Sequence, residues 1–427
     1  MKDSGIEWIG EIPEDWALVR FKDICIYLKE IVGNRSSCFD RLALTLNGVI
    51  KRAKDDSDGL QPKEFDGYQI IYENDFIFKM IDLQNISTSR VGLSPYTGLV
   101  SPAYIRFSPR KKGQYNRFVY YFLMTMYYNC VFNNLGGNGV RSALNATDMG
   151  QFFIPFPSID IQKQIVSIID KKCAVVDRLM ENQRLQIEKL KEYKQSVITE
   201  AVTKGLDKSV PLKSSGVEWI GDIAESHKIV RLKFLLSQNM AYGANESGGK
   251  NFIDSVRYIR ITDITADGSL KDGDDNQYIS KEKAKGYILS DKDILFARSG
   301  GTVGKTFLYR KFYGECAYAG YLIQAKCNAN KLLPEYLMYY TQSSLYSLWK
   351  NMIFIQATIQ NIGANKYSNL EIVDMDIEEQ KSIVDYLDTK CAEIDGLISI
   401  KQQKIEKLTE YKKSLIYECV TGKKQVG

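Results

Sequence analysis

Histidine is almost missing from this sequence, and its scarcity argues against several kinds of active site. His227 is the one histidine in 427 residues, so neither a zinc site nor histidine-based catalysis is expected. The eight cysteines include no CxxC pair, which favours buried, reduced thiols over metal ligands or a disulfide framework. The sequence therefore directs attention to functions that need no metal bound by this chain.

Long apolar runs are also missing. No stretch approaches the roughly 20 apolar residues of a membrane span, and the first residues, MKDSGIEWIG, lack the apolar segment of a signal peptide. With 44% hydrophobic and 26% charged residues, the composition is that of a soluble globular protein, and we expect a cytoplasmic location without a membrane partner. The net charge of +5 is mild, so it permits an acidic partner without requiring one.

The sequence does contain an internal repeat. Gln162–Gly205 aligns without a gap to Gln380–Lys423 at an offset of 218 residues, and 22 of the 44 aligned positions are identical. The start of each half also repeats, because SGIEWIGEI from Ser4 matches SGVEWIGDI from Ser215. The chain is therefore predicted to be two half-proteins in tandem.

Both copies of the repeated segment have the pattern of a long helix. Apolar residues recur with a heptad period, and Cys173 and Ile187 occupy a positions in a context rich in glutamate and lysine. About 45 residues at 1.5 Å each give a rod of about 65 Å. Polar residues within the apolar seam would disfavour wrong registers between two such helices. These residues are Gln183, Lys194, Lys401 and Lys412.

The remainder of each half is predicted to be a domain of short alternating strands with at least one helix, which is the α+β class. The predicted order is a domain over 1–157, a helix over 158–205, a second domain over 206–375 and a second helix over 376–427. If the second helix folds back along the first, its seam is buried. We therefore expect two domains joined by two long antiparallel coiled-coil helices, with a pseudo-twofold relation between the halves.

This order of elements resembles the specificity subunit of type I restriction-modification enzymes. The resemblance rests on SGIEWIGEIPEDW at the start and on IPFPSIDIQKQIV before the first helix, which recurs as MDIEEQKSIVDYLD. The family's opening proline and tryptophan are Pro13 and Trp16, whereas the second half has Ala224 and His227 at the matching positions.

The resemblance implies two target-recognition domains, each reading one half of a bipartite site in double-stranded DNA. It implies helices that set the spacing and dock two methyltransferase subunits, and restriction subunits where these are present. S-adenosylmethionine would then bind the methyltransferase, ATP and Mg would bind the restriction subunit, and this chain would bind no cofactor. No [DN]PP[YFW] methyltransferase signature and no nuclease or helicase motif occurs, so catalysis would belong to the partners. The alternative is a noncatalytic coiled-coil adaptor without DNA specificity.

A glycine-rich segment, SGGTVGKT from Ser299 to Thr306, comes close to a phosphate-binding loop of nucleotide hydrolases. Such a loop opens a helix, but an aromatic, strand-like segment follows here, which disfavours nucleotide hydrolysis. The preferred interpretation is a turn that brings Ser299 and Lys305 to a DNA phosphate, with Arg298 near the groove. A tight turn in a small sheet remains an alternative.

Two further pairs of segments carry residue types that bond nucleic acids. Polar loops at Gly136–Ala146 and Ile355–Ala364 hold amide and arginine side chains suited to base edges, although such loops also cap neighbouring elements. The strand-like segments Arg41–Arg52 and Arg257–Ile264 carry further candidates, or else solvated loop residues. The candidates are Asn47, Lys51, Arg52, Asn138, Arg141, Ser142, Arg260, Thr262, Asp263, Gln356, Thr358 and Gln360.

Identical residues outside the helical seam are candidates for a partner interface. If both helices dock the same partner, equivalent surface residues are expected in the two copies, whereas a solvated helix face is the simpler alternative. The candidates are Gln162, Asp177, Glu188 and Tyr193, with their equivalents Gln380, Asp395, Glu406 and Tyr411.

Overall fold

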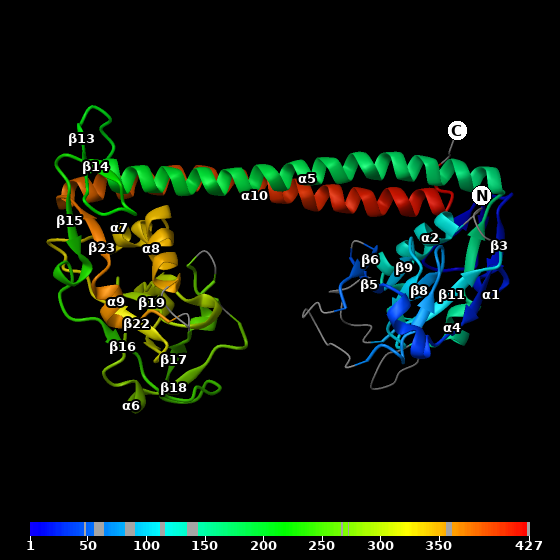
Figure 1. Ribbon diagram of the computed structural model, residues 1–427, viewed down its shortest axis with the longest axis horizontal. Coiled ribbons are helices and arrows are strands. Elements are labelled where there is room, and N and C mark those ends of the chain that lie inside the picture. The colour runs from blue at the N-terminus through cyan, green and yellow to red at the C-terminus, as the bar shows by residue number, and fades with distance from the viewer. Residues whose placement is uncertain are drawn as a thin grey trace. The chain divides into compact units, whose positions relative to one another are not determined.

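The computed structural model forms two compact units that share two long helices. It describes residues 1–46, 48–54, 64–81, 90–111, 116–134, 144–265, 268–271, 273–355 and 361–424. Unit 1 comprises Met1–Gln183 and Gln403–Gly427, and unit 2 comprises Arg184–Gln402. Helix α5 (Ile159–Lys204) and helix α10 (Ile377–Val420) each contribute one part to each unit (Figure 1).

The ends of the long helices follow from local chemistry. Strand β12 (Phe153–Phe156) contains Pro155 and directly precedes α5. At the start of α10 the Asp376 carboxylate accepts a hydrogen bond from the Glu379 amide at 2.8 Å, as an N-cap does. Gly205 ends α5 with φ of 72°, in the left-handed region that glycine adopts without strain. The second helix was predicted to continue to 427 but ends at Val420.

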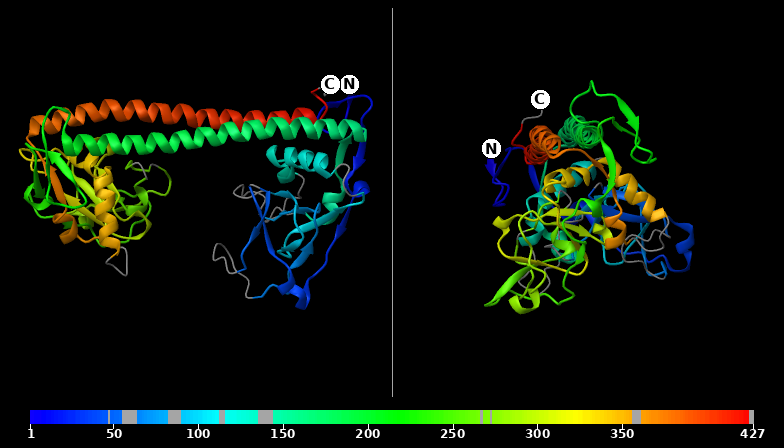
Figure 2. Two further views of the ribbon diagram at one scale, coloured as in Figure 1. Left: turned by 45° about the horizontal axis from the view of Figure 1, so that its top comes forward. Right: turned by 90° about the vertical axis from the view of Figure 1, so that its left-hand side faces the viewer.

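Within each unit the two long helices run antiparallel and bury the predicted seam. In unit 1 the Lys412 Nζ donates to Asp177 at 2.6 Å, and in unit 2 the Lys194 Nζ donates to Asp395 at 2.7 Å. The second pair is the repeat equivalent of the first with the helices exchanged, because Asp177 matches Asp395 and Lys194 matches Lys412. Figure 2 shows the two helices side by side. Seam residues Ile169, Cys173, Val176, Met180, Ile187, Leu387, Cys391, Ile394, Ile405 and Leu415 are buried.

The globular part of unit 1 is built on two four-stranded sheets. The first is antiparallel, in the order β4 (Cys25–Leu28), β11 (Ile105–Pro109), β8 (Phe76–Phe78), β9 (Val91–Leu93). The second has the order β6 (Gly48–Arg52), β5 (Arg41–Thr45), β10 (Gly98–Val100), β7 (Gln69–Ile71). Helix α2 (Asn116–Tyr128) contributes Phe118 and Phe122 to the core. The shorter elements are β1 (Lys2–Asp3), β2 (Glu11–Ile12), β3 (Ala17–Arg20), α1 (Phe21–Ile24), η1 (Gly33–Cys38), α3 (Val131–Asn134) and α4 (Ala146–Gln151).

Unit 2 repeats this plan. Its antiparallel sheet has the order β16 (Ala241–Tyr242), β22 (Leu322–Ala325), β19 (Ile294–Ala297), β20 (Thr306–Leu308). A three-stranded sheet has the order β18 (Tyr278–Ser280), β17 (Ser255–Ile259), β21 (Cys316–Tyr318). The other elements are β13 (Leu212–Ser214), β14 (Asp222–Ala224), β15 (Lys228–Arg231), η2 (Leu232–Phe234), η3 (Ile261–Asp263), α6 (Lys281–Ala284), η4 (Gly300–Thr302), η5 (Lys311–Tyr313), α7 (Pro334–Tyr340), α8 (Ser344–Ile355), α9 (Ala364–Ser368) and β23 (Glu371–Asp374).

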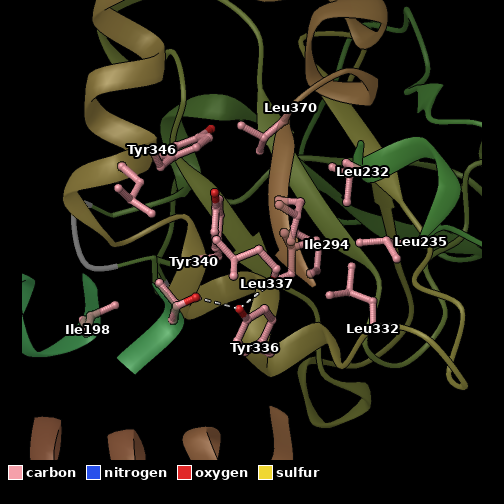
Figure 3. Packing of buried hydrophobic residues seen from close by; sticks show 14 of the residues in the cluster. Ile198, Leu232, Leu235, Ile294, Leu332, Tyr336, Leu337, Tyr340, Tyr346 and Leu370 are labelled. Atoms are coloured by element: carbon pink, nitrogen blue, oxygen red, sulfur yellow. Dashed lines mark hydrogen bonds between the residues drawn. The ribbon is translucent and has the colours of Figure 1, made fainter. Parts of the chain in front are cut away.

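Buried tyrosines connect this domain to its helices. The Tyr336 hydroxyl bonds the carbonyl oxygens of Val202, on α5, and Val373, on β23, at 3.1 and 2.8 Å (Figure 3). Two hydrogen bonds from tyrosine hydroxyls at equivalent positions of the repeat anchor α2 in unit 1 and α7 in unit 2 to a long helix. Tyr121 donates to Asp170 in unit 1, and Tyr339 donates to Asp388 at 2.5 Å in unit 2. Burial, together with the neighbouring carboxylate, raises the pKa of both phenols well above the ordinary range.

Each domain also buries one carboxylate at an equivalent turn, with different partners. Asp75 accepts from the Arg106 Nε at 2.7 Å and from the Ser108 hydroxyl. Its equivalent, Asp293, accepts from the Gln324 Nε2 at 2.6 Å. The two domains therefore keep one framework while exchanging the side chains on it.

The cysteine prediction holds in part. All eight thiols are free, and Cys25, Cys173, Cys316, Cys391 and Cys419 are buried. Cys38 and Cys130 are exposed, so for these two the predicted burial is wrong. Among the described residues, no helix has the length and apolar character needed to cross a membrane.

Candidate nucleic-acid interface

Seven of the residues predicted to contact DNA lie outside the described residues. They are Asn47, Asn138, Arg141, Ser142, Gln356, Thr358 and Gln360. At the end of the first polar loop, the Asn145 side chain accepts from the amides of Thr147 and Asp148 at 2.8 and 3.0 Å. This end of the loop therefore caps α4, which is the structural alternative considered for that segment.

In the first domain, Lys51 and Arg52 lie on β6, at the edge of its sheet. The Lys51 Nζ is 2.7 Å from Asp40 and 5.2 Å from the centre of the Tyr96 ring. The hydrogen bond to Asp40 raises the pKa of Lys51, so this group is charged at neutral pH. Arg52 lies opposite Arg41 in the strand register. To contact DNA, Lys51 would have to leave the Asp40 carboxylate and bind a phosphate instead.

In the second domain, Arg260, Thr262 and Asp263 are engaged with one another. The Arg260 Nη2 and the Thr262 hydroxyl both donate to the Asp263 carboxylate, at 2.8 and 3.3 Å, and Asp263 is buried. The strand predicted through Ile264 ends instead at Ile259, because this hydrogen-bonded group turns the backbone into η3. These side chains stabilise a turn, and Asp263 has no exposed face to offer a base.

The glycine-rich segment forms a turn between two antiparallel strands. β19 ends at Ala297, η4 follows, and β20 begins at Thr306 and pairs with β19. Gly300 and Gly304 have φ of 71° and 81°, which favours glycine at both. A side chain at Gly304 would also collide with Lys350. Because a strand and not a helix follows, the segment lacks the helix N-terminus that a phosphate-binding loop needs.

Arg298, Ser299 and Lys305 lie at the ends of this turn. The Arg298 guanidinium lies 5.0 Å from the centre of the Tyr242 ring, and Ser299 forms an isolated bridge with Asn361. The Lys305 carbonyl accepts from the Ala297 amide at 2.9 Å. Sequence reasoning missed Tyr242, Tyr321 and Asn361, which the sheet places near Arg298, because no local pattern connects residues so far apart in the chain.

Two of the predicted interface residues on the long helices are internal. Gln162 and Gln380 are 2% and 0% exposed. Their Nε2 atoms donate to the carbonyl oxygens of Pro157 and Met375 at 2.8 and 3.0 Å. Both glutamines therefore hold the start of a long helix against its own domain, and neither presents its amide to a partner.

The other predicted interface residues are exposed. Asp177 and Asp395 pair across the seam but keep half of their side-chain surface. Glu188 pairs with Lys191 on its own helix, and Glu406 is exposed. Tyr193 and Tyr411 are 51% and 48% exposed. Another equivalent pair, Leu179 and Leu397, is 45% and 49% exposed. The two leucines were not predicted, because an exposed leucine on a heptad-patterned helix cannot be told from a seam residue by its type alone.

His227, the single histidine, is also structural. It is fully buried, and its two ring nitrogens face the Thr203 carbonyl oxygen at 3.0 Å and the Glu379 carboxylate at 2.9 Å. It thereby links the end of α5 to the start of α10 within unit 2. No cluster of three or more potential metal-ligating side chains occurs in the part of the chain that the structure describes.

Comparison with known proteins matches both halves. The family model described as type I restriction modification DNA specificity domain matches residues 13–189 and 219–410. The MjaVIII specificity subunit of a type I restriction enzyme of Methanocaldococcus jannaschii is 24% identical over 444 residues, covering 97% of this chain and 94% of that protein. A second protein of that organism, named as the MjaX specificity subunit of a type I restriction enzyme, is 23% identical over 442 residues, covering 98% of this chain and 96% of that protein.

A solved structure of the type I R-M system contains a chain with a similar fold. Its TM-score is 0.67 at 16% sequence identity, and the match covers 96% of this chain and 99% of that chain. The α+β fold class, with two domains joined by long helices, is thereby confirmed. Because the family model covers both halves of the repeat, the chain belongs to the type I restriction-modification specificity subunits.

Proposed function

We propose that each globular domain reads one half of a bipartite DNA sequence, and that the paired long helices hold the two half-sites at a fixed separation. The observation that carries this proposal is the match of the DNA specificity model to both halves of an internal repeat. Two reading domains of one fold suit two half-sites of different sequence. The chain itself contributes recognition and no catalytic step.

The long helices suit the role of a spacer. They are continuous over 46 and 44 residues, and cross-helix ion pairs recur at equivalent positions in each unit. Lys401 also donates across the seam, to Gln186 at 2.5 Å. Polar contacts between apolar layers favour one register, and one register fixes one separation.

We further propose that two methyltransferase subunits dock on the outer face of the helices. Tyr193 and Leu179 are exposed, and so are their equivalents Tyr411 and Leu397, so the two helices present matching apolar groups among solvated charges. Matching surfaces bind matching partners. Asp177, Glu188 and their equivalents Asp395 and Glu406 are also exposed on the two helices.

The methyltransferase subunits would supply S-adenosylmethionine and methylate an adenine in each half-site. A restriction subunit using ATP and Mg would complete a nuclease. S-adenosylmethionine, ATP and Mg would bind to the partner subunits. The residues of this chain would position the DNA relative to those subunits. Arg141 and Gln360 remain candidate base readers of the first and second domain.

Mapping of methylated adenines tests the proposal. DNA from cells that express this chain with its methyltransferase subunit is compared with DNA from cells that express the methyltransferase alone. The expected result is one bipartite motif, with a constant gap, methylated only in the first cells. Methylation without a shared motif, or identical methylation in both, would reject DNA specificity.

A coiled-coil adaptor without DNA specificity is less well supported, because it leaves the match to the DNA specificity model unexplained. Nucleotide hydrolysis is disfavoured by the strand that follows the glycine-rich turn.

A further inference from the structure

We infer that one end of the sheet β16–β22–β19–β20 is a base-reading surface of the second domain, formed by Arg298 stacked on Tyr242 with Tyr321 and Asn361 beside it. The inference rests on the proposed function and specifies which side chains carry it out. None of these residues is adjacent to another in the sequence.

The strand register brings these residues together. Tyr242, the last residue of β16, lies opposite Ile323, and Ala297 lies opposite Leu322. Tyr242, Arg298 directly after β19 and Tyr321 directly before β22 therefore share one end of the sheet. The Arg298 amide donates to the Tyr321 carbonyl at 3.0 Å, and the Ile362 amide donates to the Arg298 carbonyl at 2.8 Å. The backbone therefore fixes Arg298 between Tyr321 on one side and Asn361 on the other.

The positive charge at this place has no counter-charge among the residues that the structure describes. Arg298 forms no ion pair with any described residue, and neither does Lys350, whose Nζ lies 5.1 Å from the centre of the Tyr346 ring. Two other arginines differ, since the buried Arg106 is bound by Asp75 and the partly exposed Arg310 by Glu335. Uncompensated cations on a preformed framework favour an anionic ligand, as DNA is.

Hydrogen-bonding groups at the same place lack partners. The Arg298 Nε, the Thr302 Oγ1 and the Asn361 Oδ1 are buried and form no hydrogen bond. The guanidinium nitrogen can only donate and the amide oxygen can only accept. Phosphate oxygens accept hydrogen bonds but donate none at neutral pH, so they cannot satisfy the amide oxygen. A base edge offers both kinds of group, with arginine suited to guanine and asparagine to adenine.

Aromatic side chains hold and extend the surface. Tyr242 is 44% exposed, and its hydroxyl accepts from the Ala364 amide at 3.0 Å, which fixes the ring beneath Arg298. Tyr321 is 58% exposed and lies at the turn between β21 and β22. Stacking on an aromatic ring preorganises an arginine, and an exposed tyrosine offers a face to an unstacked base.

The first domain has the same framework with a different side chain. At the position equivalent to Arg298 it has Met80, whose carbonyl accepts from the Leu144 amide at 3.2 Å, as the Arg298 carbonyl does from Ile362. Met80 is buried, with 1% exposure. A constant backbone carrying arginine in one domain and methionine in the other is what two half-sites of different sequence require.

The test uses the full chain purified with its methyltransferase subunit. Binding is measured to a DNA duplex that carries the bipartite motif found by methylation mapping. It is also measured to duplexes in which single base pairs of that motif are changed. Arg298→Ala should lose discrimination at one position of one half-site, by about fivefold to a hundredfold, and keep discrimination at the other half-site. Arg298→Lys keeps the charge without the planar fork, so it should relax the same position. Asn361→Ala should relax a neighbouring position. Arg231→Ala, an exposed arginine on the separate strand β15, is the matched control and should change nothing.

Two outcomes would overturn the inference. In one, Arg298→Ala weakens all duplexes alike with a smaller salt dependence, as loss of a phosphate contact does. In the other, the variants bind as the unsubstituted complex does. If Arg298→Ala fails to fold in a thermal unfolding control, Arg298→Lys and Tyr321→Ala decide between these results. Absence of any bipartite preference in the unsubstituted complex would instead reject the proposed function, and the inference with it.

Discussion

At the scale of single residues, the two domains differ in how they satisfy equivalent buried groups. Asp75 and Asp293 occupy the same turn, yet the first binds a buried arginine and the second a glutamine. Burial raises the pKa of Asp293, whereas a hydrogen bond from Gln324 and the charge of Lys326 oppose this rise. The carboxylate is therefore kept at this turn while the buried side chain that binds it differs between the domains.

Asparagine substitution at these two positions should have unequal effects. Asp75→Asn leaves the buried Arg106 guanidinium with only the partly exposed Glu30 carboxylate, 3.8 Å away, as a counter-charge, which should cost about 3 kcal/mol of unfolding free energy. Asp293→Asn leaves no buried cation behind and should cost about 1–2 kcal/mol, since one hydrogen bond is weakened. Urea unfolding of the full chain, followed by tryptophan fluorescence, measures both. Equal losses would contradict the assigned role of the Arg106 charge.

Predictions about site residues were the least reliable, for physical reasons. A basic residue in a strand-like segment suggests a DNA contact, but Arg260 meets a carboxylate three residues away, and only the folded turn reveals the pair. Gln162 and Gln380 were selected for identity between the copies, which here reflects a shared internal contact. Arg298 was predicted to lie near the DNA groove, which stays a prediction, and its neighbours Tyr242 and Asn361 come from distant parts of the chain.

At the scale of elements, the long helices were the most predictable part. A heptad pattern repeated over 44 positions depends only on local sequence, and α5 spans Ile159–Lys204 where 158–205 was expected. Strand order was not predictable, because it depends on pairings such as β5 with β10 that join residues far apart in the chain.

The ion pairs between α5 and α10 should stabilise the pairing of the two helices. Exchanging the charges of one pair between its two residues tests this. Asp177→Lys places two positive charges together and should destabilise unit 1 by about 1 kcal/mol, because the pair is partly exposed. Adding Lys412→Asp restores opposite charges and should recover most of this loss. A double-mutant cycle by urea unfolding measures the coupling, and the equivalent exchange at Lys194 and Asp395 serves as its counterpart. No recovery in the double variant would show that the pair does not contribute to stability.

At the scale of the whole molecule, the repeat offset is what sequence alone established most firmly. An offset of 218 residues relates not only the helices but also the Asp75 and Asp293 turns and the Tyr121 and Tyr339 anchors. The sequences of the two domains diverge, while these contacts persist. The chain is therefore a duplicated unit whose framework contacts are constant and whose other domain side chains differ.

The central claim is that the paired helices set the distance between two reading domains, and lengthening both helices tests it most directly. Seven residues with the heptad pattern are inserted after Arg184 and after its equivalent, Gln402, so that pairing on either side is kept. The two insertions together lengthen the helix pair by about 10 Å, which corresponds to about three base pairs of DNA. Mapping of methylated adenines should then give a motif whose half-sites are unchanged and whose gap is longer. A motif that keeps its original gap would contradict the account.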